Sequence, residues 1–209
     1  WSDTAFFEPG AGLSMGENKQ IPEDVLEDRK NFFNFMDFNN ISQAMPQAYA
    51  QFQANCQLLE EELAGSKTRY LLGDQPAWVD ILAYFPVWMA RSNIPRATEL
   101  LEPFPEIIGW SEAMEAIGRG QRTELDSTDA LQIARDAEPE GEGRVEAGAF
   151  HDFQSGDLVT VSADDYGHDA VSGLLRALNH HKIVIERDSE ALGKTAVHFP
   201  RTGFRLEHG

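Results

Sequence analysis

Cysteine, cationic side chains and long apolar runs are all scarce in this chain of 209 residues. The single cysteine, Cys56, cannot form an internal disulfide, and no run reaches the roughly 18 apolar residues that suggest a transmembrane helix. The sequence begins at Trp1, without an initiator methionine or the basic and apolar regions of a signal peptide. These absences predict a reducing, cytoplasmic location and a chain that begins partway through a longer one.

The charge is strongly one-sided. Seventeen lysines and arginines stand against 35 aspartates and glutamates, which gives a formal net charge of -18. Such a field repels the phosphate backbone, so nucleic acid is not an expected partner. Basic clusters beside an apolar segment, which would bring the protein to an anionic membrane, are also missing. With 42% hydrophobic and 25% charged residues, the chain has the composition of an ordinary folded domain.

Helical periodicity dominates the first two thirds of the sequence. Pro9, Gly10, Gly12 and Gly16 suggest that residues 1–21 are a connecting segment, and Pro22 then starts a helix. A later stretch, 77–92, is apolar on nearly every side, which predicts a central buried helix that is kinked at Pro86. The expected helices cover residues 22–38, 42–65, 77–92, 95–101, 105–117 and 128–137, which together predict a helical bundle domain over 22–137.

A change in composition divides the chain. Residues 138–149 begin with alternating Glu, Pro and Gly and predict a linker. Beyond it, short apolar runs at 158–161, 171–178, 183–185, 195–199 and 204–206 are separated by turn residues. They predict a small antiparallel sheet or partly closed barrel over 150–209, so the fold class is mainly α, and α+β overall.

The most specific motif runs from Leu71 to Tyr84, with the sequence LLGDQPAWVDILAY. It resembles the start of the central core helix of the glutathione transferase superfamily, where a Gly-Asp turn leads into a capping box. Asp80 stands three residues after Ala77, so its carboxylate can accept a hydrogen bond from the amide of Ala77. Ala77 occupies a place where the family usually has Ser or Thr, which removes one of the two reciprocal bonds. Asp80 is therefore interpreted as a structural capping residue rather than a catalytic one.

The resemblance covers roughly residues 20–120 and implies the C-terminal all-helical domain of such a transferase. Residues 156–205 are similar to a tail found in some bacterial members. In this family glutathione, the co-substrate, sits on a separate thioredoxin-like domain, whose pattern does not precede Phe6. No catalytic residue is therefore assigned, and the chain by itself is expected to be inactive. The resemblance also implies a homodimer.

The helical domain of this family supplies the apolar half of the site, which receives a small electrophilic substrate. The candidate substrate-binding residues are Phe32, Phe33, Phe35, Met36, Tyr49, Trp88 and Arg91. Burial in the core is the competing interpretation for these aromatics.

Other constellations carry weaker signals. Cys56 lies on an apolar seam without a neighbouring base, which favours an inert core thiol over a nucleophile. The histidines at 180, 181 and 198 lack zinc-site spacing, so no metal is assigned. Residues 164–169 lack the ligand periodicity of a calcium loop and predict a polar turn.

Three functions remain open at this stage. The first is the co-substrate half of a transferase-like protein that conjugates or reduces small electrophiles, a detoxification role. The second is a non-catalytic protein interaction module with the same helical fold. The third is a carrier that holds an apolar ligand among the aromatic residues.

Overall fold

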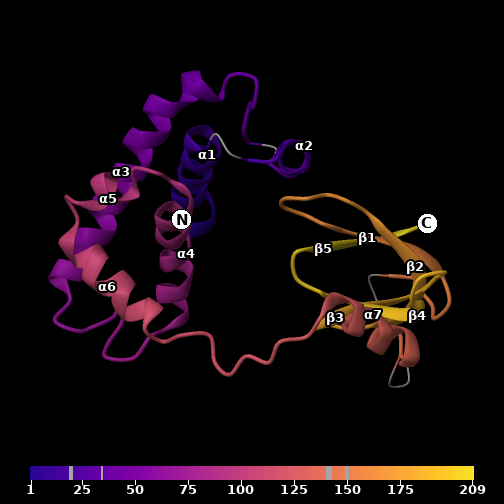
Figure 1. Cartoon of the computed structure of the whole chain (residues 1–209). Helices are drawn as coiled ribbons and strands as arrows, with labels where there is room; N and C mark the ends of the chain where they lie inside the picture. The colour runs from indigo at the N-terminus through magenta and orange to yellow at the C-terminus, as the bar shows by residue number, and fades with distance from the viewer. Residues whose placement is uncertain (19–20, 34, 140–142, 149–150) are drawn as a thin grey trace. The chain divides into compact units, whose positions relative to one another are not determined.

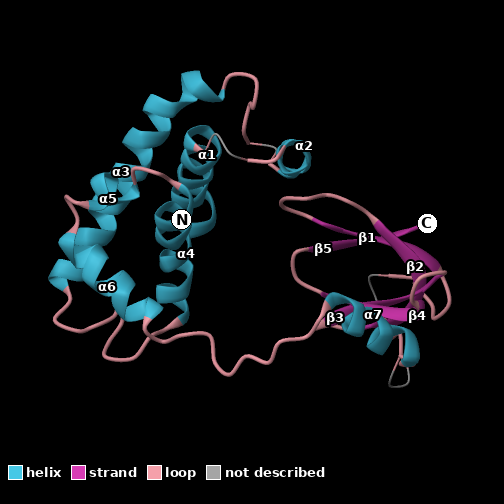
Figure 2. Ribbon diagram, viewed as in Figure 1, coloured by secondary structure: helices cyan, strands magenta, loops and turns pink. Residues whose placement is uncertain are grey.

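The computed structural model describes residues 1–209 except 19–20, 34, 140–142 and 149–150. The parts of the expected connecting segment, first helix, linker and tail that fall on these positions lie outside the described residues. The rest of the chain divides into two compact units, Trp1–Gln121 and Arg122–Gly209. Figure 1 traces the chain through both units, and Figure 2 shows that the first is helical while the second holds all the strands.

The helical unit begins with a π-helical turn, η1 (Ser2–Phe6), which continues into α1 (Phe7–Glu17). Phe6 and Leu13 are fully buried here, so the segment belongs to the core and the expectation of a connecting segment is corrected. The glycines have a packing role. A Cβ on Gly10 would lie 3.1 Å from Met89 Cε, and one on Gly16 would lie 2.1 Å from Met45 Sδ. Glycine therefore lets α1 approach its neighbours closely.

The remaining helices of this unit are α2 (Glu23–Phe32), α3 (Ile41–Gly65), α4 (Trp78–Asn93), α5 (Ala97–Leu101) and α6 (Pro105–Glu115). Both α1 and α6 contact α3 and α4 (Figure 1). The seam predicted on α3 is buried at Phe52, Cys56, Leu59 and Leu63. The first predicted helix ends earlier than expected, because the chain is already extended at Phe33.

The apolar surface of α4 corrects a second expectation. Small residues on one side, Ala83, Val87 and Ala90, are buried against the core. The large residues lie on the other side and are 39–70% exposed; they are Trp78, Ile81, Phe85 and Trp88. We call these four residues the α4 stripe. The helix is therefore buried along one face rather than all round.

The second unit contains α7 (Ser127–Asp136) and five strands: β1 (Leu158–Ala163), β2 (Val171–Leu178), β3 (Lys182–Ser189), β4 (Gly193–Pro200) and β5 (Phe204–His208). The sheet is antiparallel, in the order β4-β3-β2-β1-β5, and it is open rather than closed into a barrel. Alternate residues such as Val159, Leu175 and Ile185 form its own core. Arg135 of α7 donates to the carbonyl of Ala191 at 2.7 Å, so α7 lies with the strands, whereas the sequence placed it in the helical domain.

Candidate functional site

Asp80 fixes the start of α4 and is completely buried. Its Oδ2 accepts from the amide of Ala77 at 2.9 Å, which is the predicted half of the capping box. Its Oδ1 accepts from the amide of Leu71 at 2.9 Å and from the indole of Trp110 at 3.0 Å. One carboxylate therefore ties the preceding turn, the start of α4 and α6 together. This is a structural role, and it sets the position of the α4 stripe.

A second carboxylate positions α6. Glu60 of α3 accepts from the amides of Glu106 and Ile107, at 3.0 and 2.9 Å. These amides belong to the first turn of α6, where backbone N–H groups have no carbonyl acceptor within the helix. The two carboxylates, Asp80 and Glu60, thus hold α3, α4 and α6 in register.

An aromatic cluster connects α1, the segment after α2, and α4. Phe7 lies at its centre, with ring centroids 6.1 Å from Phe33, 6.2 Å from Phe35 and 5.7 Å from Phe85. Phe85 also stacks on Trp88 at 6.1 Å. The remaining member, Phe32, contacts Phe33 edge-on at 5.1 Å. Phe7 and Phe33 are buried, whereas Phe85 and Trp88 are 47% and 39% exposed, so the cluster has an inner and an open end.

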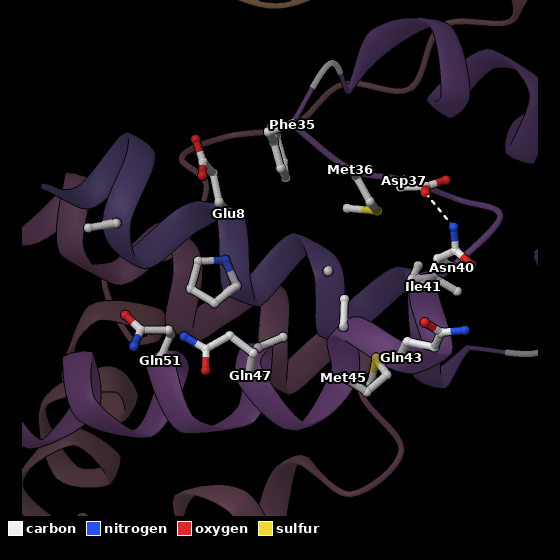
Figure 3. Close-up of a pocket in the computed structure, with 15 residues that line it drawn as sticks. Glu8, Phe35, Met36, Asp37, Asn40, Ile41, Gln43, Met45, Gln47 and Gln51 are labelled. Atoms are coloured by element: carbon white, nitrogen blue, oxygen red, sulfur yellow. Dashed lines mark hydrogen bonds between the residues drawn. The ribbon is translucent and has the colours of Figure 1, made fainter.

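The first cavity beside this cluster lies between α1, α3 and residues 35–41, and we call it the α1–α3 cavity (Figure 3). It encloses about 570 Å³, a volume within the usual range for small-molecule sites. Phe35 and Met36 line it, together with Glu8, Asp37 and a row of glutamines on α3.

A second hollow follows the open end of the cluster, between α4 and the end of α6, and we call it the α4–α6 groove. It also encloses about 570 Å³. Phe85, Trp88 and Tyr84 form its aromatic wall, with Arg119 and Glu115 as its charged residues. Burial raises the pKa of the Tyr84 phenol, and the carboxylate of Glu115 raises it further. The phenol is therefore a neutral hydrogen-bond donor at physiological pH.

The structure brings together only some of the candidate substrate-binding residues. Phe32, Phe33, Phe35 and Trp88 all belong to the aromatic cluster, and Met36 lies beside it in the α1–α3 cavity.

Two further candidates lie apart from both cavities. Tyr49 donates to Glu17 of α1, and the guanidinium of Arg96 lies 5.8 Å from the centre of its ring. Arg91 donates to Ser111 of α6 at 2.7 Å. Both side chains connect helices, and neither lines the α1–α3 cavity or the α4–α6 groove.

Phe7 and Phe85 were missed by the sequence reasoning. Phe7 was assigned to a connecting segment, and Phe85 was included in a helix expected to be buried throughout. The signal that could have found Phe85 is the spacing of Trp78, Ile81, Phe85 and Trp88, which places large residues on one face while the small ones occupy the other.

The thiol of Cys56 is fully buried in the α3 seam. Burial raises the pKa of this thiol, and the nearby carboxylate of Glu60 raises it further. It is therefore not an activated nucleophile. Across the described residues, no three or more His, Cys, Asp or Glu side chains gather closely enough to hold a metal ion. The same described residues include no helix that combines the length and hydropathy of a membrane span.

The helical unit and the fold of the whole chain are each similar to known proteins. Residues 32–117 match the family model for the glutathione S-transferase C-terminal domain. The fold of the whole chain is similar to the crystal structure of a GST-like protein from Pseudomonas syringae, with a TM-score of 0.69 and 24% identity. That alignment covers 100% of this chain and 65% of the other, so this chain spans about two thirds of the neighbour's length. A search of curated proteins found no match. Residues 32–117 of the helical unit are therefore similar to the C-terminal domain of glutathione S-transferases.

Proposed function

We propose that the helical unit supplies the apolar half of a glutathione transferase-like active site, and that the α4–α6 groove receives the small electrophilic substrate. The observation that carries the proposal is the open end of the aromatic cluster, where Phe85 and Trp88 present stacked faces in a hollow of about 570 Å³. Exposed aromatic rings of this kind bind planar apolar molecules by stacking and by removal of apolar surface from water.

Glutathione would be held by a thioredoxin-like domain outside the described helices. Activation of its thiol needs a hydrogen-bond donor or positive field near sulfur, and the buried Cys56 cannot replace that thiol. The glutathione thiolate would attack the electrophilic carbon of an aryl halide, halide would leave, and the thiol proton would pass to solvent. The helical unit would contribute orientation and exclusion of water to this step.

The exposed α4 stripe is a suitable docking surface for the thioredoxin-like domain, which would form the second half of the site. Its residues are large and apolar, yet they remain 39–70% exposed, and contiguous patches of this kind mark interaction surfaces. A thioredoxin-like domain that covers the stripe would close the α4–α6 groove. A cytoplasmic homodimer with a detoxification role completes the proposal.

The test compares this chain with the longer protein that carries it, using immobilised glutathione and a panel of aryl halides, epoxides and peroxides. We expect the chain alone to be inactive and the longer protein to bind glutathione and to act on the panel. Failure of the longer protein in both assays would contradict the transferase function.

The same stripe favours a second candidate, a non-catalytic interaction module. In that case a longer protein without transferase activity would be recovered from cell extract in a stable complex that survives moderate salt. A variant with Trp78→Ser and Ile81→Ser would lose this complex while keeping its fold, whereas recovery of a lone homodimer would count against the module.

A further inference from the structure

The α1–α3 cavity has a chemistry that the proposed transferase role does not use. Its fifteen described lining residues include two carboxylates, Glu8 and Asp37, and no lysine, arginine or histidine. Figure 3 shows Glu8 beside Phe35 above α1, Asp37 beside Asn40 farther along the cavity, and Met36 between these two pairs. Negative charge therefore stands at two separate places around an open hollow of about 570 Å³.

Hydrogen bonds from its neighbours favour the ionised form of Asp37. Its Oδ1 accepts from the amide of Asn39 at 3.0 Å, and its Oδ2 accepts from Asn40 Nδ2 at 2.6 Å. Hydrogen bonds to a carboxylate favour the charged state, and those from Asn40 and Asn39 lower the pKa of Asp37 below its usual value. The same contacts hold this charge at the start of α3.

The walls between the two carboxylates are soft and apolar. Phe35, Met36, Ile41 and Met45 contribute an aromatic ring, two thioethers and an aliphatic side chain. An aromatic face attracts a cation through its quadrupole, and methionine adapts to ligands of different shape. On the α3 side, Gln43, Gln47 and Gln51 follow at four-residue intervals and add neutral amide oxygens.

We propose that the α1–α3 cavity binds a small organic ammonium ion with an apolar body. The carboxylates supply the charge, and Phe35 with the methionines covers the apolar part. The net charge of -18 raises the local concentration of cations and repels anions such as carboxylates. This site is distinct from the α4–α6 groove, so it stands or falls separately from the transferase function.

The experiment uses the whole chain with its methionine methyl groups labelled with ¹³C. There are five methionines, of which Met36 and Met45 line the α1–α3 cavity and Met114 lines the α4–α6 groove. The probe is benzyltrimethylammonium, compared with its neutral isostere neopentylbenzene and with the anion phenylacetate. We expect saturable shifts of Met36 and Met45 with the ammonium ion, at an affinity at least tenfold above that for the neutral isostere. The affinity for the ammonium ion should fall at high salt.

Charge-removing variants test the role of the carboxylates. The double variant Glu8→Gln, Asp37→Asn should weaken ammonium binding by about tenfold, since it removes a half-buried charge at Glu8 and an exposed charge at Asp37. The matched control Glu62→Gln, Asp129→Asn removes two exposed charges elsewhere and should change the affinity less than twofold. Because Asp37 also organises the turn before α3, the single variant Glu8→Gln provides the readout if the double variant unfolds.

Three results would overturn the proposal. Equal binding of neopentylbenzene and the ammonium ion would make the site merely apolar. Equal losses of ammonium affinity in the two double variants would show that the effect comes from the net charge of the whole molecule. Shifts confined to Met114, with Met36 and Met45 unchanged, would place the ligand in the α4–α6 groove instead.

Discussion

Trp110 of α6 donates its indole N–H to Oδ1 of Asp80 in α4 at 3.0 Å, and both side chains are buried. The aspartate thus does more than cap its own helix, because the same carboxylate also receives the amides of Leu71 and Ala77. A motif that looks like a local helix signal in the sequence is a tertiary contact in the structure. Both walls of the α4–α6 groove depend on it.

Replacement of Asp80 by Asn should destabilise the helical unit strongly. The amide keeps one acceptor oxygen but places an NH₂ group against one of the three donors, and it loses the charge that strengthens the bonds. We expect the free energy of unfolding in urea to fall by roughly 3 kcal/mol. The matched control Asp24→Asn, an exposed aspartate in α2, should change it by less than about 0.5 kcal/mol. Equal effects of the two variants would contradict the role of Asp80.

Replacement of Ala77 by Ser should stabilise the protein. Ala77 has the extended backbone of a helix N-cap, with φ -114° and ψ 172°, but its methyl group cannot accept a hydrogen bond. A serine oxygen could accept from the amide of Asp80 and complete the box, with a gain of about 0.5–2 kcal/mol in urea unfolding. Ala64→Ser, at an exposed site inside α3, should instead lose about 0.5 kcal/mol. A loss of stability in both variants would show that the N-terminus of α4 gains no hydrogen bond from a serine at position 77.

Tyr49 should ionise at unusually high pH. Burial raises its pKa to about 12, and its hydrogen bond to Glu17 acts in the same direction. The neutral phenol is therefore favoured in the folded state, and this contribution to stability is complete below pH 10 and lost as the pH rises from 10 to about 12. Absorbance at 295 nm should show a late step that Tyr49→Phe removes. A step near pH 10 that Tyr49→Phe removes would contradict the contact, since the other three tyrosines titrate in both proteins.

Cys56 should resist thiol reagents while the protein is folded. Its side chain is buried and the raised pKa of the thiol leaves little thiolate, so a disulfide reagent at pH 8 should react only through unfolding. We expect the rate to rise steeply across the urea transition. Stoichiometric reaction within minutes in native buffer would show instead that the α3 seam opens readily.

The sequence predicted the elements with strong periodicity and missed those defined by packing. The α3 seam, the α4 start at Asp80 and the five strands follow from local spacing and turn residues. The helix over Phe7–Glu17 does not, because Gly10 and Gly16 look like loop residues until Met89 and Met45 are found against them. The exposure of the α4 stripe was likewise not predicted, because the presence of an apolar residue does not show whether the core or a partner covers it.

The candidate site was predicted in part for a similar reason. Phe32, Phe33 and Phe35 are near neighbours in the sequence and contact one another, whereas Trp88 comes from α4. Phe7 and Phe85 are what connect the two groups. Tyr49 and Arg91 have the right chemistry for a site but are used to join helices. Whether a side chain lines a site or joins two helices depends on which side chains meet across helices, and local sequence patterns do not specify this.

The most direct test of the central claim follows the indole N–H signals of the four tryptophans by NMR during titration with 1,3-dinitrobenzene, an aromatic ring without a leaving group. Trp→Phe variants at positions 1, 78 and 88 assign the signals. The account predicts a saturable shift of Trp88, little change at Trp110, and a three- to tenfold loss of affinity in Phe85→Ala, as expected for one lost aromatic stack. A Trp88 signal that stays fixed at saturating ligand would contradict an apolar substrate site in the α4–α6 groove.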